Sequence, residues 1–241
     1  MSEASETDLR FDVPLYTVAE AARALDVSPT TLSAWATGYL RHWPDRPAVT
    51  GAPVVTSLTP VGRGQAAIPF VGLAEGMVLA AVRAAGVPMQ RVRPALAVLA
   101  AELGVDHALG SRRLLTDGAE LLFDYADNAA GDEADSVRQL VVVRSGQRVF
   151  RDVIEQYLAR IDYAPDGYAR LVRLPGYATA EVVADPERAF GQPIFARGGS
   201  RVADVLGRFW AGDDLATLAD EFGVPRAELE DVLRVASRRA A

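Results

Sequence analysis

Residues 15–36, which read "LYTVAEAARALDVSPTTLSAWA", constrain the fold most, because they have the spacing and capping pattern of two short helices joined by a tight turn. Thr17 followed by Glu20 is the pattern of a capping box at a helix start. Ser28 followed by Pro29 is the pattern of a second helix start. One face of the first helix is apolar, at Val18, Ala21, Ala22 and Leu25. The segment therefore predicts a helix-turn-helix.

The second of these helices carries no basic residue between positions 28 and 37, although nucleic-acid-binding proteins usually place basic residues at their contact surface. Hydroxyl groups are the groups it can offer to phosphates or base edges, and the candidates are Thr30, Thr31 and Ser33. Arg41 and Arg46 follow the helix and are candidate phosphate contacts. Leu32 and Trp35 are expected to pack against the first helix rather than to stack on bases.

Residues 54–71, "VVTSLTPVGRGQAAIPFV", contain two short apolar runs around Gly62, Arg63 and Gly64, which predicts a β-hairpin. Arg63 at its tip is placed to reach a phosphate or a narrow minor groove. Two helices are expected next, over residues 72–86 and 88–104, each ending at a glycine.

The middle segment, residues 106–176, predicts hairpins that turn at residues 117–118 and 145–146. An acidic stretch, residues 127–136, lies between them and is either a solvated loop or a surface for a basic partner. An amphipathic helix is expected over residues 151–163, followed by a strand and a turn over residues 167–177.

Residues 177–241 predict three helices. Gly212 ends the first, Asp213 or Asp214 caps the second, Gly223 ends it and Pro225 opens the third, so the last two form a second helix-turn-helix. An apolar face there is either the core of this small unit or a dimer or partner interface, and its residues are Phe209, Trp210, Phe222 and Val232. The whole chain is expected to be mainly α with small β elements, in segments 14–105, 106–176 and 177–241.

Composition narrows the function classes. The chain has no cysteine and two histidines, so thiolate zinc sites, disulfides and histidine-based triads are not expected. No phosphate-binding glycine loop or catalytic set is visible, which predicts a protein that is not an enzyme and needs no cofactor or metal. No apolar run has the length of a membrane span and the acidic N-terminus is unlike a signal peptide, so a cytoplasmic protein without membrane contact is expected.

All 25 basic residues are arginine, and the net charge is −7. Residues 1–113 contain 10 arginines and 10 acidic residues, whereas residues 114–241 contain 15 arginines and 22 acidic residues. The acidic excess therefore lies in the second half. The overall charge therefore does not by itself support DNA binding, although it leaves room for a local basic patch.

The first segment resembles the winged helix of the mercury-resistance-regulator (MerR) type. The resemblance rests on about a dozen positions: Tyr16, Thr17, Val18, Glu20, Ala21, Ala22, Leu25, Val27, Ser28, Thr31, Leu32 and Trp35. It implies a DNA-binding fold. Ser33 stands where this family usually has an arginine, and the cysteines of its metal-sensing members are absent.

The last segment resembles a helical domain of unknown function of the four-three-three type. Its pattern is met at Asp185, Pro186, Gly191, Pro193, Val202, Asp204, Val205, Leu206, Gly212, Leu218, Ala219, Phe222, Leu229, Val232 and Leu233. Proteins with this domain often look like Vap-type antitoxins, so the resemblance implies a cognate PIN-type ribonuclease toxin and operator DNA as partners. A homodimer is expected because so small a C-terminal unit buries little apolar surface by itself.

Three hypotheses follow. The first is an antitoxin that neutralises a PIN-type ribonuclease and represses its own operon. The second is a one-component transcriptional regulator that binds an apolar effector. The third is an interaction scaffold in which both helix-turn-helix units have lost DNA binding.

Overall fold

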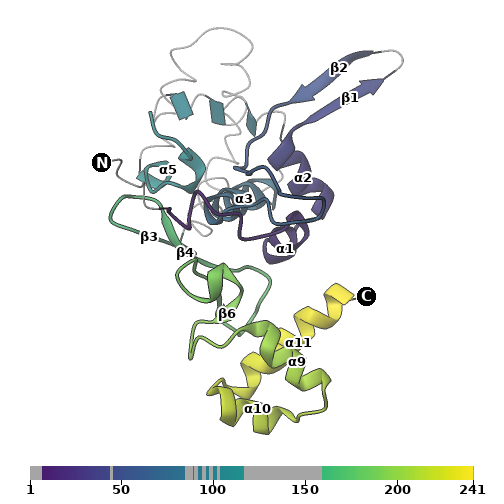
Figure 1. The fold of residues 1–241 in the computed structure, drawn as a ribbon, viewed down its shortest axis with the longest axis vertical. Helices are drawn as coiled ribbons and strands as arrows, with labels where there is room; N and C mark the ends of the chain where they lie inside the picture. Colours follow the sequence, from purple (N-terminus) through teal and green to yellow (C-terminus); the bar gives the residue numbers. More distant parts are fainter. Residues whose placement is uncertain are drawn as a thin grey trace, which may run out of the picture.

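The fold is taken from a computed structural model that describes residues 7–43, 46–84, 104–116 and 159–240, together with residues 89, 92–93, 96–97 and 100–101. Short helices and small antiparallel sheets make up these parts (Figure 1). The expected class, mainly α with small β elements, is confirmed. In the described residues no helix has both the length and the apolar character needed to cross a membrane.

The chain begins with the predicted helix-turn-helix, formed by α1 (Val18–Ala24) and α2 (Pro29–Thr37). Both halves of the capping box are present, since Glu20 N donates to Thr17 Oγ1 and Thr17 N donates to Glu20. Ser28 accepts from Thr31 N at the start of α2. Leu32 and Trp35 are buried in the core, as their spacing predicted.

A two-stranded antiparallel hairpin follows α2 directly, with β1 (Tyr39–Trp43) and β2 (Arg46–Gly51). The hairpin predicted around Gly62–Gly64 is wrong, because residues 52–67 form a loop without a strand. Three prolines in and beside that stretch, Pro53, Pro60 and Pro69, have no N–H for a strand ladder. Its apolar residues, such as Val55 and Ile68, are instead buried singly in the core.

The central helix of the molecule is α3 (Phe70–Ala84), which is buried from Phe70 through Val82. Glycines let neighbours approach it closely. A side chain at Gly72 would collide with the carbonyl of Thr56, and one at Gly76 would lie 2.6 Å from Leu25 Cδ1. The helix was predicted over 72–86 and begins two residues earlier. The described positions between 89 and 101 are also helical, as predicted.

The next described residues hold a 3₁₀ turn, η1 (Ala108–Gly110), and a one-turn helix, α5 (Arg113–Thr116). The hairpin predicted to turn at residues 117–118 needs a strand before that turn, and residues 113–116 are helical instead. They close one helical turn after Ser111, whose hydroxyl accepts from Arg113 N. The turns predicted at residues 117–118 and 145–146, the acidic stretch 127–136 and most of the helix predicted over 151–163 lie outside the described residues.

A four-stranded antiparallel sheet then runs in the order β3-β4-β5-β6, built from β3 (Ile161–Tyr163), β4 (Ala169–Arg173), β5 (Val182–Ala184) and β6 (Ile194–Phe195). The prediction that Ile161 lies on a helix is wrong, because this residue pairs with Val172 across the sheet. A 3₁₀ turn, η2 (Ala189–Gly191), separates β5 from β6. The sheet joins residues on both sides of position 176.

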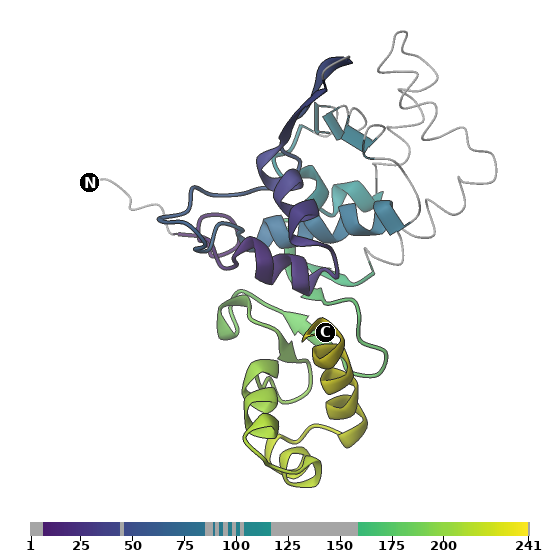
Figure 2. The same ribbon diagram turned by 90° about the vertical axis from the view of Figure 1, so that its right-hand side faces the viewer.

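Three helices end the chain, α9 (Val202–Trp210), α10 (Leu215–Phe222) and α11 (Arg226–Ala240). The predicted caps are confirmed: Asp214 accepts from Ala216 N and Thr217 N, and Gly223 ends α10 at a φ of 63°. In both views the β1–β2 hairpin and these helices lie at opposite ends of the long axis (Figures 1 and 2).

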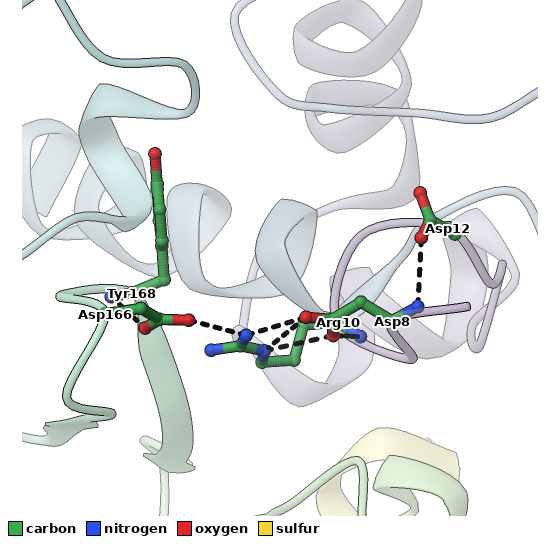
Figure 3. A network of polar contacts seen from close by, with 5 residues as sticks. All are labelled: Asp8, Arg10, Asp12, Asp166 and Tyr168. Carbon is green, nitrogen blue, oxygen red and sulfur yellow. Dashed lines mark hydrogen bonds and ion pairs between the residues drawn. The ribbon is translucent and has the colours of Figure 1, made fainter. Parts of the chain in front are cut away.

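Two polar contacts attach the first residues to the rest of the chain. Arg10 Nη2 lies 2.6 Å from Asp166 Oδ2 in the β3–β4 turn and also pairs with Asp8 (Figure 3). Further on, the buried Tyr16 hydroxyl donates to the carbonyl of Gly191 in η2 over 2.7 Å. These contacts join the helix-turn-helix end to the sheet and to the start of the C-terminal region.

Candidate nucleic-acid interface

The start of α2 presents hydroxyl groups, as the sequence predicted. Thr30 is exposed, and Thr31 and Ser33 are partly exposed. The Thr31 hydroxyl lies 2.8 Å from that of Ser28 and also accepts a hydrogen bond from Arg83 Nη1 at 2.8 Å. Thr31 is thus engaged within the protein, whereas the side chain of Thr30 is the more accessible of the two for a phosphate.

Arg83 supplies the positive charge that α2 itself lacks. It is exposed and lies in the last turn of α3, 52 positions after Thr31 in the chain. Sequence reasoning missed it, because the pattern of a buried helix gives no sign of which neighbour its last turn meets. A guanidinium beside the N-terminus of α2 makes this end of the helix suited to a phosphate group.

The two arginines predicted to follow α2 lie on the hairpin. In its register Arg41 of β1 pairs with Val49, and Arg46 of β2 pairs with Trp43. Arg63 lies elsewhere, on the exposed loop between β2 and α3, next to Gly64 at a φ of 78°. The hairpin that directly follows the helix-turn-helix therefore carries Arg41 and Arg46, and Arg63 belongs to a separate loop.

One further arginine connects α2 with the base of the hairpin. Arg93 Nη2 donates to the carbonyl of Ala34 at 3.2 Å, and its guanidinium lies 5.2 Å from the centre of the Tyr39 ring. A side chain at Gly51 would lie 3.1 Å from the Arg93 Cζ atom. Burial lowers the pKa of Arg93 from its ordinary value, although an arginine stays protonated in proteins.

Several arginines of the C-terminal helices are paired with acids. Arg208 on α9 pairs with both Asp213 and Glu221, and on α11 Arg226 pairs with Glu230 and Arg234 with Asp231. Arg238 on α11 instead donates to the carbonyl of Gly176. Like Arg238, Arg23 on α1 and Arg83 on α3 have no carboxylate partner among the described residues. Both helix-turn-helix units therefore carry arginines whose charge is not paired with an acid.

The predicted partner residues of the C-terminal helices occupy different depths. Val232 is buried in the core, and Phe209 and Phe222 are partly buried against it. Trp210, at the end of α9, is 66% exposed. A large aromatic side chain that remains open to solvent is the feature of this set that a protein partner can cover. The described residues contain no group of three or more acidic or histidine side chains that could hold a metal ion.

Comparison with protein families identifies the kind of domain that the first helix-turn-helix belongs to. Residues 14–96 match the family described as "Putative DNA-binding HTH domain", and residues 182–236 match a family described as a protein of unknown function. The chain thus contains a helix-turn-helix domain of the DNA-binding class.

Comparison with individual proteins then gives the family. The chain is 49% identical over 235 residues to the Mycobacterium tuberculosis protein named "Putative antitoxin VapB45", covering 97% of this chain and 98% of that protein. It also matches the crystal structure of Rv2018 from Mycobacterium tuberculosis, with 47% identity, a TM-score of 0.78, and coverage of 93% of this chain and 100% of the other. The chain belongs to the family of this VapB45 protein.

Proposed function

We propose that the protein is an antitoxin that binds a cognate PIN-type ribonuclease and represses its own operon from the cytoplasm, without catalytic activity of its own. The observation that carries this proposal is the near full-length similarity to a protein named as an antitoxin, over a chain that contains a helix-turn-helix domain. The PIN type of the toxin comes from the resemblance of the C-terminal helices to domains of Vap-type antitoxins.

The arrangement of the molecule favours DNA binding at one end and protein binding at the other. The end with α2, Arg83 and the β1–β2 hairpin binds operator DNA through phosphate contacts at the hydroxyls of α2 and the nearby guanidinium groups. The opposite end, with exposed Trp210 on α9, binds a second copy of the chain. This contact leaves the DNA-binding end accessible, as a repressor requires.

A homodimer fits the small number of positive charges in each copy. One helix with neutral side chains reads little sequence, and two copies on adjacent half-sites double the phosphate contacts. The dimer contact is assigned to the C-terminal helices, where Trp210 and the partly buried Phe209 lie at the end of α9.

Fluorescence anisotropy tests the proposal. Labelled duplex from the gene's own upstream region is titrated with the protein over a salt series, with and without the product of the neighbouring gene. Binding that exceeds that of scrambled duplex and weakens steeply with salt is expected, and the neighbouring product should tighten it. Failure of the duplex to bind in both states, or lack of a complex between the two proteins, would contradict the proposal.

A second function has an observation in its favour. A regulator that responds to a small effector needs a pocket near its DNA-binding elements, and such a pocket lies behind α2. In that case DNA affinity changes with a small molecule and no toxin is bound. The third hypothesis, a scaffold without DNA binding, would be supported by absence of any upstream duplex binding in the titration above.

A further inference from the structure

A pocket of about 570 Å³ lies between the loop before α3, α3 itself and the helical positions around Arg93. This volume is in the range of pockets that hold small molecules. Most of its wall is apolar and comes from four separate parts of the chain, including Pro53, Val54, Val55, Leu96, Leu109 and Leu114. The pocket therefore provides an apolar environment with few polar groups.

The acidic group in the pocket already has its partners. The buried Glu75 accepts from Thr56 N at 2.6 Å and from Thr56 Oγ1 at 3.1 Å, and it lies 3.3 Å from His107 Nδ1. The hydrogen bond to Glu75 is the main cause that raises the pKa of His107. Glu75 and His107 thus compensate each other, and their shared polar atoms are not open to a ligand.

The basic group in the pocket wall is Arg93, and two of its nitrogen atoms have no hydrogen-bond partner within the described residues. Arg93 uses Nη2 for the carbonyl of Ala34, while Nε and Nη1 are buried and have no hydrogen-bond partner. The Tyr39 ring beside the guanidinium compensates its charge in part and accepts none of these hydrogen bonds. Arg93 has no carboxylate partner among the described residues, and an unpaired charge beside apolar walls is costly, which favours an anionic group in the pocket.

We propose that this pocket binds a small molecule with an apolar body and one anionic group, which pairs with the positive charge of Arg93. A carboxylate or a sulfonate supplies the negative charge that Arg93 lacks among the described residues. The apolar walls cover the rest of the ligand. Binding itself is independent of the proposed function.

The position of Arg93 links this site to the proposed DNA-binding elements. The same guanidinium contacts Ala34 of α2, Tyr39 of β1 and the space beside Gly51 of β2. An anion that draws Arg93 toward the pocket changes the contacts that hold α2 and the hairpin together. The ligand is therefore expected to alter DNA affinity, and this consequence alone rests on the proposed function.

Two fluorescent probes of nearly the same shape test the site. Anilinonaphthalene sulfonate has an apolar body and one anionic group, and N-phenylnaphthylamine has the apolar body without the charge. Arg93→Gln removes the cation, and Ala97→Trp fills the pocket from an exposed alanine in its wall. Arg197→Gln and Ala227→Trp are the matched controls, at exposed positions outside the pocket.

The full chain should bind one sulfonate probe per copy. Arg93→Gln should weaken this binding about tenfold or more, since the positive charge that pairs with the anion is lost, and should leave the neutral probe unaffected. Ala97→Trp should weaken both probes, and the two controls neither. Circular dichroism melting confirms that each variant is folded.

The proposal is overturned if the wild type shows no saturable binding of the sulfonate probe, if Arg93→Gln binds it as tightly as the wild type, or if Arg93→Gln weakens both probes equally. Repeating the DNA titration with and without the sulfonate probe separates the two proposals. If no duplex binds at all, the proposed repressor function fails while the ligand site stands on the probe data.

Discussion

Arg83 Nη1 donates a hydrogen bond to Thr31 Oγ1 over 2.8 Å, so the last turn of α3 is joined to the first turn of α2. Arg83 has no carboxylate partner among the described residues, and its remaining donors are available. The contact places a positive charge at the helix whose own side chains are neutral. It also orients the hydroxyl of Thr31, a residue that the sequence analysis predicted as a DNA contact.

Arg83→Gln should weaken binding of the upstream duplex and reduce the salt dependence. Loss of one phosphate contact lowers the slope of log affinity against log salt by about 0.9. The measurement is anisotropy over a salt series, with Arg197→Gln as a control that removes an exposed arginine elsewhere. An unchanged slope would show that Arg83 serves only to hold Thr31.

The position of the hairpin predicts which arginines matter most for DNA. Arg41→Ala combined with Arg46→Ala alters the β1–β2 hairpin, and Arg63→Ala alters a separate loop. The double variant should lower duplex affinity at least tenfold, because two phosphate contacts are lost, whereas Arg63→Ala should change it less. The assignment of the hairpin to DNA fails if Arg63→Ala is the more damaging variant.

Position 191 requires glycine because the Tyr16 hydroxyl lies too close for a side chain there. Its φ is +73°, and a side chain there would collide with the Tyr16 hydroxyl and lie 3.2 Å from Leu15 Cδ1. Gly191→Ala should therefore lower the free energy of unfolding by about 2 kcal/mol or more. Gly64→Ala is the matched control, since its φ is +78° and no atom lies within 4 Å of the added carbon. Equal losses in urea unfolding would mean that only backbone strain matters.

Tyr16→Phe removes the hydrogen bond to the Gly191 carbonyl and retains the ring. Since the bond is buried, the variant should lose about 1 kcal/mol of unfolding free energy. Urea unfolding measures this loss. A variant as stable as the wild type would show that the contact adds nothing to the attachment between the two ends of the molecule.

Asp231 anchors the segment before β5 to α11. Its Oδ2 atom accepts from the backbone N–H groups of Ala178, Thr179 and Ala180, at 2.7, 2.7 and 3.0 Å. Burial acts to raise the pKa of Asp231, but these three bonds and the charge of Arg234 outweigh it, and the pKa is lowered. Asp231→Asn should thus cost about 2 kcal/mol of unfolding free energy at neutral pH.

The pH dependence of this effect has a definite sign. Because the folded pKa lies below the unfolded one, the stability that Asp231 contributes is complete above the unfolded pKa of about 4 and is lost as pH falls through the folded pKa. The difference between wild type and Asp231→Asn should therefore shrink as urea unfolding is measured at lower pH. Asp220→Asn, at an exposed position of α10, should show little difference at either pH.

Much of the local structure was predictable, since it depends on neighbours in the chain. Thr17, Ser28 and Asp214 cap helices through residues two or three positions away, and Gly223 ends α10 because its left-handed backbone suits glycine. The apolar pattern around Leu32 and Trp35 placed them in the core correctly. The similarity of the first unit to MerR proteins stays a prediction, as do its individual DNA contacts.

The sequence by itself thus determined both helix-turn-helix units and the fold class, because capping and amphipathic spacing act over a few residues. Only the tertiary structure decided where the hairpin lies, that Arg83 meets Thr31, and that Arg93 lines an apolar pocket. These features join residues dozens of positions apart. Their pairing is set by how α3 and the loop before it pack in the core, which short-range patterns do not contain.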